Sequence, residues 1–471
     1  MDARGEGTRA DAGGEHTAGD EDLLSALRAR ARLGGGWLHV PFHGGVSEEP
    51  EFKAWFALDQ TELDGLDDWA SPKGLIRQVE ARLARHYGLD EAALLVGGSS
   101  QGLTTALLAA LRPGDLLLSH RGAHRALLHG VLLTGARLRV VEDRTDAAWG
   151  VSWPDVDALA AQVRRRKPTA VLVTSPTYNG LAPDLGALRR ACDQAGSLLL
   201  VDAAHGAHFG LGPLPPLASA VRSDLIVFGL HKSGGAPTAG AVLGRVGQGV
   251  AEQRWLGARR AVGTSSPSYP LMAAIERAVM RLEEDGAEAM TRLSTLMASL
   301  KGPAVFRPPL GLQADPTRVT VSATGARSRQ ELRTLGVDAE YVASRHLLLL
   351  GTLATQSLPP SLGEWVAGQA APGPGPAAPP PPVRRMEVRT AFFAGSELVP
   401  LRRALGRVLA VPLVPSPPGI PLLWPGEVLD GARLAEVQAA TAAGQTVLGL
   451  DGGQIPVVGE RVRAGKKGPR A

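Results

Sequence analysis

Two short apolar segments, each followed by polar side chains, constrain the fold of this chain more than any other feature. The first segment, at 198–202, ends in Asp202, and the second, at 224–228, is followed closely by Lys232. A strand buried inside a parallel sheet has this pattern, because both of its faces are covered and its polar groups gather at its carboxyl end. We therefore predict two buried strands that deliver a carboxylate and a lysine.

The segment from about residue 73 to 250 alternates helix-like and strand-like patterns. Helices are predicted at 72–87, 103–111, 124–134, 153–166 and 184–195. Strands are predicted at 93–96, 116–119, 137–141, 170–174, 198–202, 224–228 and 240–244. This alternation is typical of an α/β fold, in which helices cover both faces of a mostly parallel sheet. The last strand, which follows the lysine, is a candidate for the reversed direction.

The 471 residues are enough for two domains with tails. The expected division is a disordered tail at 1–20, an N-terminal segment with one helix at 21–72, a major domain at 73–300, a small α+β segment at 301–369, a linker at 370–383, a C-terminal α+β domain at 384–459 and a basic tail at 460–471. Two long helices are predicted at 268–284 and 286–300. The linker is rich in proline and is expected to be extended and solvated.

The composition favours a cytoplasmic protein. No stretch approaches 18 uninterrupted apolar residues, and the N-terminus lacks the apolar region of a signal peptide. The single cysteine, Cys192, excludes an internal disulfide. The formal charge is +4, and the basic runs at 164–167 and 461–470 contain no interleaved aromatic residues. We therefore expect neither a nucleic acid nor a membrane as a partner.

A glycine-rich loop, Gly97-Gly-Ser99-Ser100-Gln101-Gly102, lies between a predicted strand and an apolar helix. Glycines let the backbone approach a ligand closely, and free amides at a helix N-terminus attract a phosphate. Either serine could add a hydroxyl contact, although serine is also an ordinary N-cap. A phosphate loop, a carboxylate and a lysine, in this order, suit pyridoxal phosphate. The lysine amine can bind the cofactor's aldehyde, and the carboxylate can keep the ring nitrogen protonated.

Three histidines lie near these groups in the sequence. His124 follows a predicted strand, where it could cover a flat ring or move protons, or could simply begin a helix. His205 and His208 follow Asp202 at a spacing that suits two metal ligands, but no third ligand is evident. No metal site is expected.

Several ordered motifs carry a resemblance to a known family. They lie at 59–68, 72–77, 175–180, 201–208, 231–232, 264–269, 391–393, 417–421 and 425–427. On these motifs the chain resembles the ornithine/lysine/arginine decarboxylase family over residues 38–458, in its compact form with a C-terminal domain. The resemblance implies pyridoxal phosphate as cofactor, and the aspartate aminotransferase fold (fold type I).

The resemblance also implies roles for individual residues. Lys232 would hold the cofactor, Asp202 would pair with its ring nitrogen, and His205 would face the reacting carbons. His124 would stack on the ring. The other cofactor contacts would be Ser99, Ser100, Gln101, His231 and Ser265. A basic substrate needs an acidic partner, and the candidates are Glu62, Asp64, Asp67 and Glu427. Family members are built from dimers with active sites at the subunit interface. Ser265 and the acidic segment 59–68, at the active-site entrance, would therefore serve a neighbouring subunit.

The implied activity is that of a lyase of polyamine biosynthesis, which releases CO2 and an amine from arginine, lysine or ornithine. Three positions depart from the family: Ala203 replaces a glutamate, and Gly229 and Leu230 replace a serine and a threonine. The missing hydroxyls predict weaker binding of the cofactor phosphate. Two alternatives remain. The first is another enzyme with the same cofactor, such as an aminotransferase or an aldolase-type lyase, although no arginine stands out to bind a substrate carboxylate. The second is a non-catalytic paralogue.

Overall fold

The computed structural model describes residues 22–33, 37–323 and 325–459. The tails expected at 1–20 and 460–471 lie outside these residues. No helix in the described part of the chain is long and apolar enough to cross a membrane.

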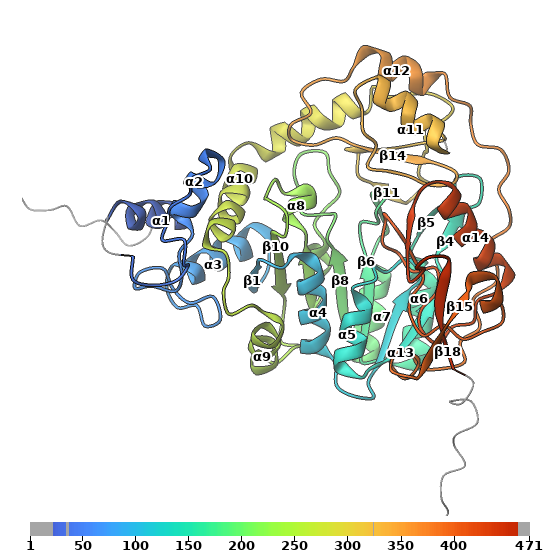
Figure 1. Ribbon diagram of the computed structural model, residues 1–471, viewed down its shortest axis with the longest axis horizontal. Helices are drawn as coiled ribbons and strands as arrows, with labels where there is room; N and C mark the ends of the chain where they lie inside the picture. The colour runs from blue at the N-terminus through green and yellow to red at the C-terminus, as the bar shows by residue number, and fades with distance from the viewer. Residues whose placement is uncertain (1–21, 34–36, 324, 460–471) are drawn as a thin grey trace, which may run out of the picture.

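A seven-stranded sheet forms the centre of the molecule, in the order β1-β10-β9-β8-β6-β2-β3 (Figure 1). Its strands are β1 (Glu91–Leu95), β2 (Leu116–His120), β3 (Arg137–Val141), β6 (Ala170–Thr174), β8 (Leu198–Ala203), β9 (Leu225–Phe228) and β10 (Ala241–Arg245). β10 is antiparallel to both of its neighbours, and the other adjacent pairs are parallel. The predicted sheet, mostly parallel with its last strand reversed, is therefore confirmed.

Helices cover both faces of this sheet, which explains why its inner strands are mostly apolar. They are α3 (Leu75–Tyr87), α4 (Gly98–Ala110), α5 (Leu127–Thr134), α6 (Val156–Arg166), α7 (Gly186–Ala195) and α9 (Glu252–Val262). α4 packs against α5 and α9, and α6 packs against α7 (Figure 1). All four residues of β9 are buried, and only the first residue of β8 is partly exposed.

The N-terminal arm and a long helix flank the sheet. The arm contains α1 (Leu23–Arg32) and α2 (Pro50–Leu58). The sequence predicts two helices after residue 268, but the structure has one continuous helix, α10 (Tyr269–Met297). Gly286 is buried inside this helix, and a Cβ atom there would lie only 3.0 Å from Leu211 Cδ1, so its lack of a side chain allows this close packing. A glycine inside a helix costs about 1 kcal/mol relative to alanine.

α10 leads into a smaller domain with its own hydrophobic core. A three-stranded antiparallel sheet contains β12 (Arg318–Val321), β14 (Leu347–Leu350) and β13 (Tyr341–Val342), in that order. The helices of this domain are α11 (Gly325–Thr334) and α12 (Pro360–Ala367). A short strand, β11 (Gln313–Ala314), pairs with β7 (Leu181–Ala182) of the major domain. This pairing holds the start of β12 against the carboxyl end of the large sheet.

The linker 370–383 contains neither helix nor strand, but it contacts the body of the protein. The carbonyl of Gly373 accepts a hydrogen bond from Arg345, and the backbone of Gly375 lies against the carbonyl of Ala147. The C-terminal domain follows, with α13 (Val388–Phe392), β15 (Ser396–Pro400), β16 (Val414–Ser416), α14 (Gly431–Ala442), β17 (Thr446–Leu448) and β18 (Gln454–Val458). The remaining short elements are β4 (Arg144–Asp146), β5 (Val151–Trp153), η1 (Ala218–Val221), α8 (Leu230–Ser233) and η2 (Leu401–Ala404).

Candidate active site

Lys232 lies in α8, a single helical turn that directly follows β9. Its Nζ atom lies 3.2 Å from Nε2 of His205, which follows the neighbouring strand β8. Burial lowers the pKa of Lys232, the charge of Asp202 opposes this effect, and the charge of Arg318 adds to it. A lysine with a lowered pKa is a better nucleophile, because more of it is the neutral amine at neutral pH.

Asp202 lies at the carboxyl end of β8, with 5% of its surface exposed. Among the described residues, its carboxyl group accepts one hydrogen bond, from the N–H of Ala204 at 3.2 Å. Burial raises the pKa of Asp202, and the charge of Lys232 opposes the rise. A buried carboxylate with so few donors requires a further cationic partner to remain ionised.

Arg318 also contacts His205, although it lies outside the motifs of the sequence. It begins β12 in the small domain, and only 1% of its side chain is exposed. Its Nη2 atom lies 3.2 Å from Nδ1 of His205, and its Nη1 donates to the carbonyl of Tyr178 at 2.6 Å. Its Nε donates to Asp315 at 3.0 Å. No local pattern marks this arginine in the sequence, because a different domain brings it to the site.

His124 lies between the large sheet and the C-terminal domain. The N–H of Arg125 donates to the carbonyl of Gly419 at 3.1 Å. A Cβ atom on Gly419, whose φ is +82°, would lie 3.1 Å from Nε2 of His124. Burial, together with the nearby charge of Lys232, lowers the pKa of His124 to about 3. The histidine is therefore neutral at physiological pH, and the C-terminal domain fixes its position.

The glycine-rich loop opens α4. Gly98 has a φ of +74°, and the Oε1 atom of Gln101 accepts the N–H of Gly97 at 2.8 Å. Ser99 Oγ is buried without a hydrogen-bond partner in the described structure. Ser100 is exposed and lines a cavity of about 540 Å³ beside the loop. The loop thus combines a stabilised backbone with one buried hydroxyl that has hydrogen-bonding capacity to spare.

Gly229 faces this hydroxyl. A Cβ atom at position 229 would lie 2.7 Å from Ser99 Oγ and 2.5 Å from the carbonyl oxygen of Ala204. The hydroxyl of Ser99 therefore fills the space in which a side chain at 229 would begin. A serine at 229 cannot be accommodated without displacing Ser99 or the backbone.

In the acidic segment 59–68, the carboxylates of Asp67 and Glu62 already accept hydrogen bonds from the protein. The carboxylate of Asp67 accepts backbone N–H groups at the start of α3, among them those of Lys73 and Gly74. Burial would raise the pKa of Asp67, but these backbone donors outweigh it and lower the pKa. Glu62 accepts the hydroxyl of Thr61, and Asp64 is exposed.

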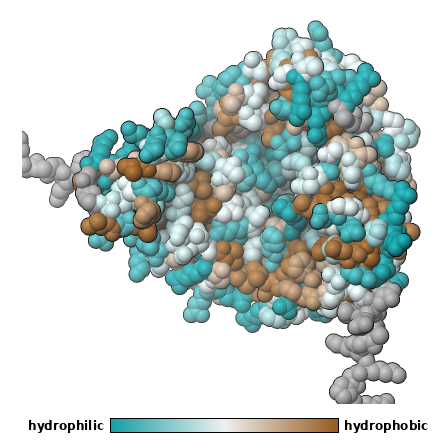
Figure 2. Space-filling view, viewed as in Figure 1, coloured by the Kyte–Doolittle hydropathy of each residue, from teal (hydrophilic) through white to brown (hydrophobic). Residues whose placement is uncertain are grey.

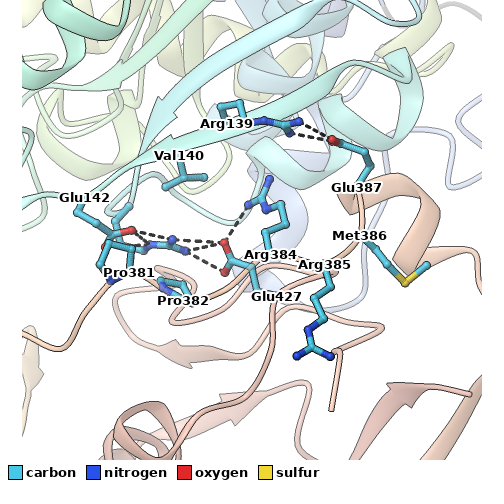
Figure 3. Close-up of a pocket in the computed structure, with 11 residues that line it drawn as sticks. Arg139, Val140, Glu142, Pro381, Pro382, Arg384, Arg385, Met386, Glu387 and Glu427 are labelled. Carbon is cyan, nitrogen blue, oxygen red and sulfur yellow. Dashed lines mark hydrogen bonds and ion pairs between the residues drawn. The ribbon is translucent and has the colours of Figure 1, made fainter. Parts of the chain in front are cut away.

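Glu427 lies at the junction between the C-terminal domain and the major domain. Only 2% of it is exposed, and its oxygens accept Arg121 at 3.0 Å and Arg384 at 2.9 Å (Figure 3). It also accepts the N–H of Trp424 at 2.9 Å. The structure therefore does not bring Glu427 together with Lys232 and Asp202. Its carboxylate lines a separate cavity of about 410 Å³ and stabilises the junction.

Glu340 is a second residue of the site that lies outside the motifs of the sequence. Its Oε1 accepts the hydroxyl of Tyr178 at 2.5 Å, and the ring of Tyr178 meets His205 edge-on with centroids 4.8 Å apart. Glu340 is exposed. Burial lowers the pKa of Lys232, and the negative charge of Glu340 raises it. The loop before β13 thus places a carboxylate near the lysine. The sequence around 322–340 carries no motif that would have indicated it.

The remaining predicted residues have the following surroundings. His231 Nδ1 lies 3.1 Å from the carbonyl of Gly240, and Ser265 is exposed on the loop after α9. His208 Nε2 lies 3.0 Å from Asp315. Within 22–33, 37–323 and 325–459, no group of three His, Cys, Asp or Glu side chains could hold a metal ion.

The strand order, the buried carboxyl at the end of β8 and the lysine after β9 define the fold of the type I pyridoxal-phosphate enzymes. The family models agree with this class. The Orn/Lys/Arg decarboxylase major domain matches residues 49–300, and the C-terminal domain of the same family matches residues 381–451. The chain belongs to the Orn/Lys/Arg decarboxylase family, so the predicted family, fold and enzyme class are confirmed.

Individual relatives cover nearly the whole chain. The arginine decarboxylase of Bacillus subtilis is 26% identical over 93% of this chain and 96% of its own length. The arginine decarboxylase of Bacillus anthracis is 26% identical over 91% of this chain and 94% of its own. Among solved structures, the lysine decarboxylase LdcF of Francisella novicida has a TM-score of 0.77 at 16% identity, covering 93% of this chain and 81% of that one. The structural similarity at this identity shows the shared fold.

Proposed function

We propose that the protein is a pyridoxal-phosphate-dependent decarboxylase that converts a basic amino acid into its amine and CO2. The observation that carries this proposal is the buried pair of Asp202 and Lys232, in a chain that belongs to a decarboxylase family. Relatives named as arginine decarboxylases and structural neighbours named as lysine decarboxylases support a basic amino acid as the substrate.

The residues present fit the cofactor. Asp202 is a buried carboxyl that lacks a full set of donors, and Ser99 Oγ is a buried hydroxyl without a partner at the N-terminus of α4. These two groups suit a ring N–H and a phosphate oxygen, and Lys232 supplies the amine for the aldehyde. When bound, the cofactor supplies a protonated ring that accepts the electron pair left as CO2 departs. Asp202 holds the proton on that ring, and Ser99 orients the phosphate.

Two groups can return a proton to the substrate after CO2 has left. His205 and Lys232 lie within 3.2 Å of each other at the carboxyl edge of the sheet. His124 is neutral and is held by the C-terminal domain, so we assign it to covering the ring rather than to transferring a proton. Ser100, Gln101, His231 and Ser265 remain predicted cofactor contacts.

We assign recognition of the distal positive charge of the substrate to Glu340. This carboxylate is exposed, acts on Lys232 and is oriented by Tyr178, whose ring contacts His205. Of the four acidic residues predicted from the sequence, Glu427 is occupied by two arginines, and Asp67 by backbone N–H groups. Glu62 and Asp64 remain candidates from a neighbouring subunit.

We propose a homodimer, or an oligomer built from dimers, located in the cytoplasm. α2 has no buried residue, and the N-terminal arm exposes large apolar side chains (Figure 2). These exposed residues are Leu38, Val40, Phe42, Val46, Phe52 and Trp55. Apolar surface also gathers over α4 and α5 in the same view, where Leu133 is exposed (Figure 2). Exposed apolar surface of this kind supports a subunit interface. A monomer in sedimentation experiments would contradict this assembly.

The function is tested by incubating the protein, loaded with pyridoxal phosphate, separately with arginine, lysine and ornithine. Released CO2 and the matching amine are measured for each amino acid, and a neutral amino acid of similar length serves as the control. Turnover of at least one basic substrate, with none of the neutral control, is the expected result. Cofactor binding without any CO2 release would exclude the decarboxylase and favour an aminotransferase or an aldolase-type lyase. Absence of cofactor binding would favour a non-catalytic paralogue.

Ser99→Ala is expected to weaken cofactor binding by roughly 1.5–3 kcal/mol, or about one to two decades in Kd, because one hydrogen bond to a charged phosphate is lost. Thr105→Ala is the matched control, since Thr105 also has a buried hydroxyl without a partner, but deeper in α4. Titration of the cofactor-free proteins measures both effects. An unchanged Kd for Ser99→Ala would mean that the phosphate binds elsewhere.

Glu340→Gln is expected to weaken binding of a diamine product about tenfold, because the distal ammonium loses its counter-charge. Binding of a monoamine of the same length, which has no distal charge, should not change. Asp338→Asn is the matched control: Asp338 is exposed two residues away and pairs with Arg333 at 3.5 Å. Calorimetry with both amines measures these affinities. Equal losses for the two amines would show that Glu340 does not read the distal charge.

A further inference from the structure

We propose that Arg318 is a positioning residue that fixes the proton of His205 on Nε2 and thereby holds Lys232 as a neutral amine. This inference concerns the site of the proposed function, but it rests on contacts within the protein alone. The three side chains form one series of short contacts. Arg318 Nη2 lies 3.2 Å from His205 Nδ1, and His205 Nε2 lies 3.2 Å from Lys232 Nζ.

The first contact determines where the imidazole carries its proton. A guanidinium has only N–H donors and stays charged at all relevant pH values, so it cannot accept a hydrogen bond. His205 Nδ1 must therefore accept, which requires its lone pair. A neutral imidazole has a single N–H, and this hydrogen must then lie on Nε2. Protonation of both nitrogens would direct a cationic N–H at the guanidinium.

The second contact determines the state of the lysine. With its proton on Nε2, His205 directs an N–H donor at Lys232 Nζ. An ammonium group has three donors and no lone pair, so it cannot accept this hydrogen bond, whereas a neutral amine can. The pKa shifts point the same way. Burial is the main cause that lowers the pKa of His205 and that of Lys232, and the charge of Arg318 lowers both further.

Arg318 is itself held in a single orientation. Its Nε donates to Asp315 Oδ2, which also lies 3.0 Å from Nε2 of His208. Asp315 Oδ1 accepts the hydroxyl of Thr317 at 2.6 Å, and the side chain of Asp315 is 0% exposed. The Nη1 of Arg318 donates to the carbonyl of Tyr178. These contacts use the other two nitrogens of the guanidinium, so Nη2 remains directed at His205.

The charges around Lys232 show why such a device is needed. The groups that act on Lys232, or on which it acts, are Asp202, Glu340, Arg318, His124, His205 and His231. The two carboxylates favour the ammonium form, which is a poor nucleophile. Arg318 opposes these two carboxylates at Lys232 Nζ. It favours the neutral amine through its own positive charge and through the tautomer of His205.

The test measures how readily Lys232 reacts with a trace amount of an amine-modifying reagent in cofactor-free protein, across a range of pH. Mass spectrometry of the Lys232 peptide gives the midpoint pH of the reaction. The parent should show a midpoint below that of an ordinary lysine. Arg318→Gln should raise this midpoint by about one pH unit, because a nearby positive charge and the fixed tautomer are both lost. Arg318→Lys, which keeps the charge, should raise it less.

Arg245→Gln is the control for the loss of a buried arginine. Arg245 is 5% exposed and pairs with Glu91 at 2.9 Å. It lies opposite Leu225 at the start of β9, whereas Lys232 follows the other end of that strand. In Arg245→Gln, the midpoint pH of Lys232 labelling should equal that of the parent. Thermal unfolding and circular dichroism confirm that each variant is folded. An unchanged midpoint in folded Arg318→Gln overturns the proposal.

The parent alone keeps the proposal testable if the Arg318 variants do not fold. A parental midpoint equal to that of an ordinary lysine would overturn the proposal without any variant. The labelling requires no turnover, so its outcome is independent of the decarboxylase assay. A protein that releases no CO2 but has the low midpoint loses the proposed function and keeps this inference. A protein that releases CO2 but has the labelling midpoint of an ordinary lysine keeps the proposed function and loses this inference.

Discussion

Lys232→Ala is expected to abolish both the covalent attachment of pyridoxal phosphate and the release of CO2, while the protein still folds. The lysine is half-buried at the end of a four-residue helix, and truncating it removes a group that is costly to bury and opens no large core cavity. Treatment with borohydride, followed by mass spectrometry, measures the attachment. The CO2 assay measures activity, and circular dichroism measures folding.

Lys301→Ala is the matched control for this variant. Lys301 is exposed just beyond α10, so its loss should leave attachment and activity at the parental level. If borohydride still fixed the cofactor to folded Lys232→Ala, another lysine would hold it. The proposed binding site of the cofactor, at the carboxyl ends of β8 and β9, would then be wrong. Retained CO2 release in this variant would contradict the proposed function in the same way.

Asp202→Asn is expected to lower turnover by about 10²–10³-fold, with cofactor attachment largely retained. An amide has nearly the shape of the carboxyl but carries no charge, so it cannot keep the ring nitrogen protonated. Attachment depends on Lys232, which this substitution leaves in place. Steady-state decarboxylation and the borohydride assay measure the two effects separately.

The control for this prediction is Asp224→Asn. Asp224 precedes β9 and pairs with Arg189 at 2.7 Å, at the amino end of the strand and away from Lys232. Its substitution should cost stability, which thermal unfolding measures, but should leave turnover per folded molecule near the parental value. Near-parental turnover of Asp202→Asn would show that another carboxylate performs this role. Equal losses in the two variants would indicate a general disturbance of the sheet.

The main secondary structure of the major domain follows from the sequence because it depends on local patterns. The run of apolar residues at 198–202 is nearly coextensive with β8, and the strands predicted at 137–141 and 170–174 agree with β3 and β6. β6 and β8 lie inside the sheet and are buried on both faces, so most of their residues are apolar, whereas the edge strand β3 keeps two arginines. The long helix α10 was predicted as two, because the effect of Gly286 depends on Leu211, which lies far away in the sequence.

Residues in the site that follow strands directly were found from the sequence, and those that come from other domains were not. Asp202, Lys232 and the loop at 97–102 are next to strand ends, where an apolar run followed by polar groups is visible. Arg318 and Glu340 lie in the small domain, and local sequence carries no record of the pairing of β11 with β7 that brings this domain to the sheet. The contact of Gly419 with His124 is missed for the same reason.

The sequence does not show what the predicted acidic residues bind. Glu427 and Asp67 are carboxylates in motifs that carry the family resemblance, and no local pattern indicates their partners. The structure gives Glu427 two arginines from separate segments and gives Asp67 the free N–H groups of α3. Whether a carboxylate stays exposed, as Glu340 does, or is buried among several protein donors, as Glu427 is, depends on residues brought together by folding.

The sequence by itself thus determined the strands of the sheet and the family, and it predicted the cofactor, because each depends on residue types at short and regular spacing. The tertiary structure decided the order of the strands and the partners of each charged group. These depend on distances of about 3 Å between side chains that are far apart in the chain, such as Arg318 and His205. Hydrogen bonds act only at such distances, so their partners can be known only when the chain is folded.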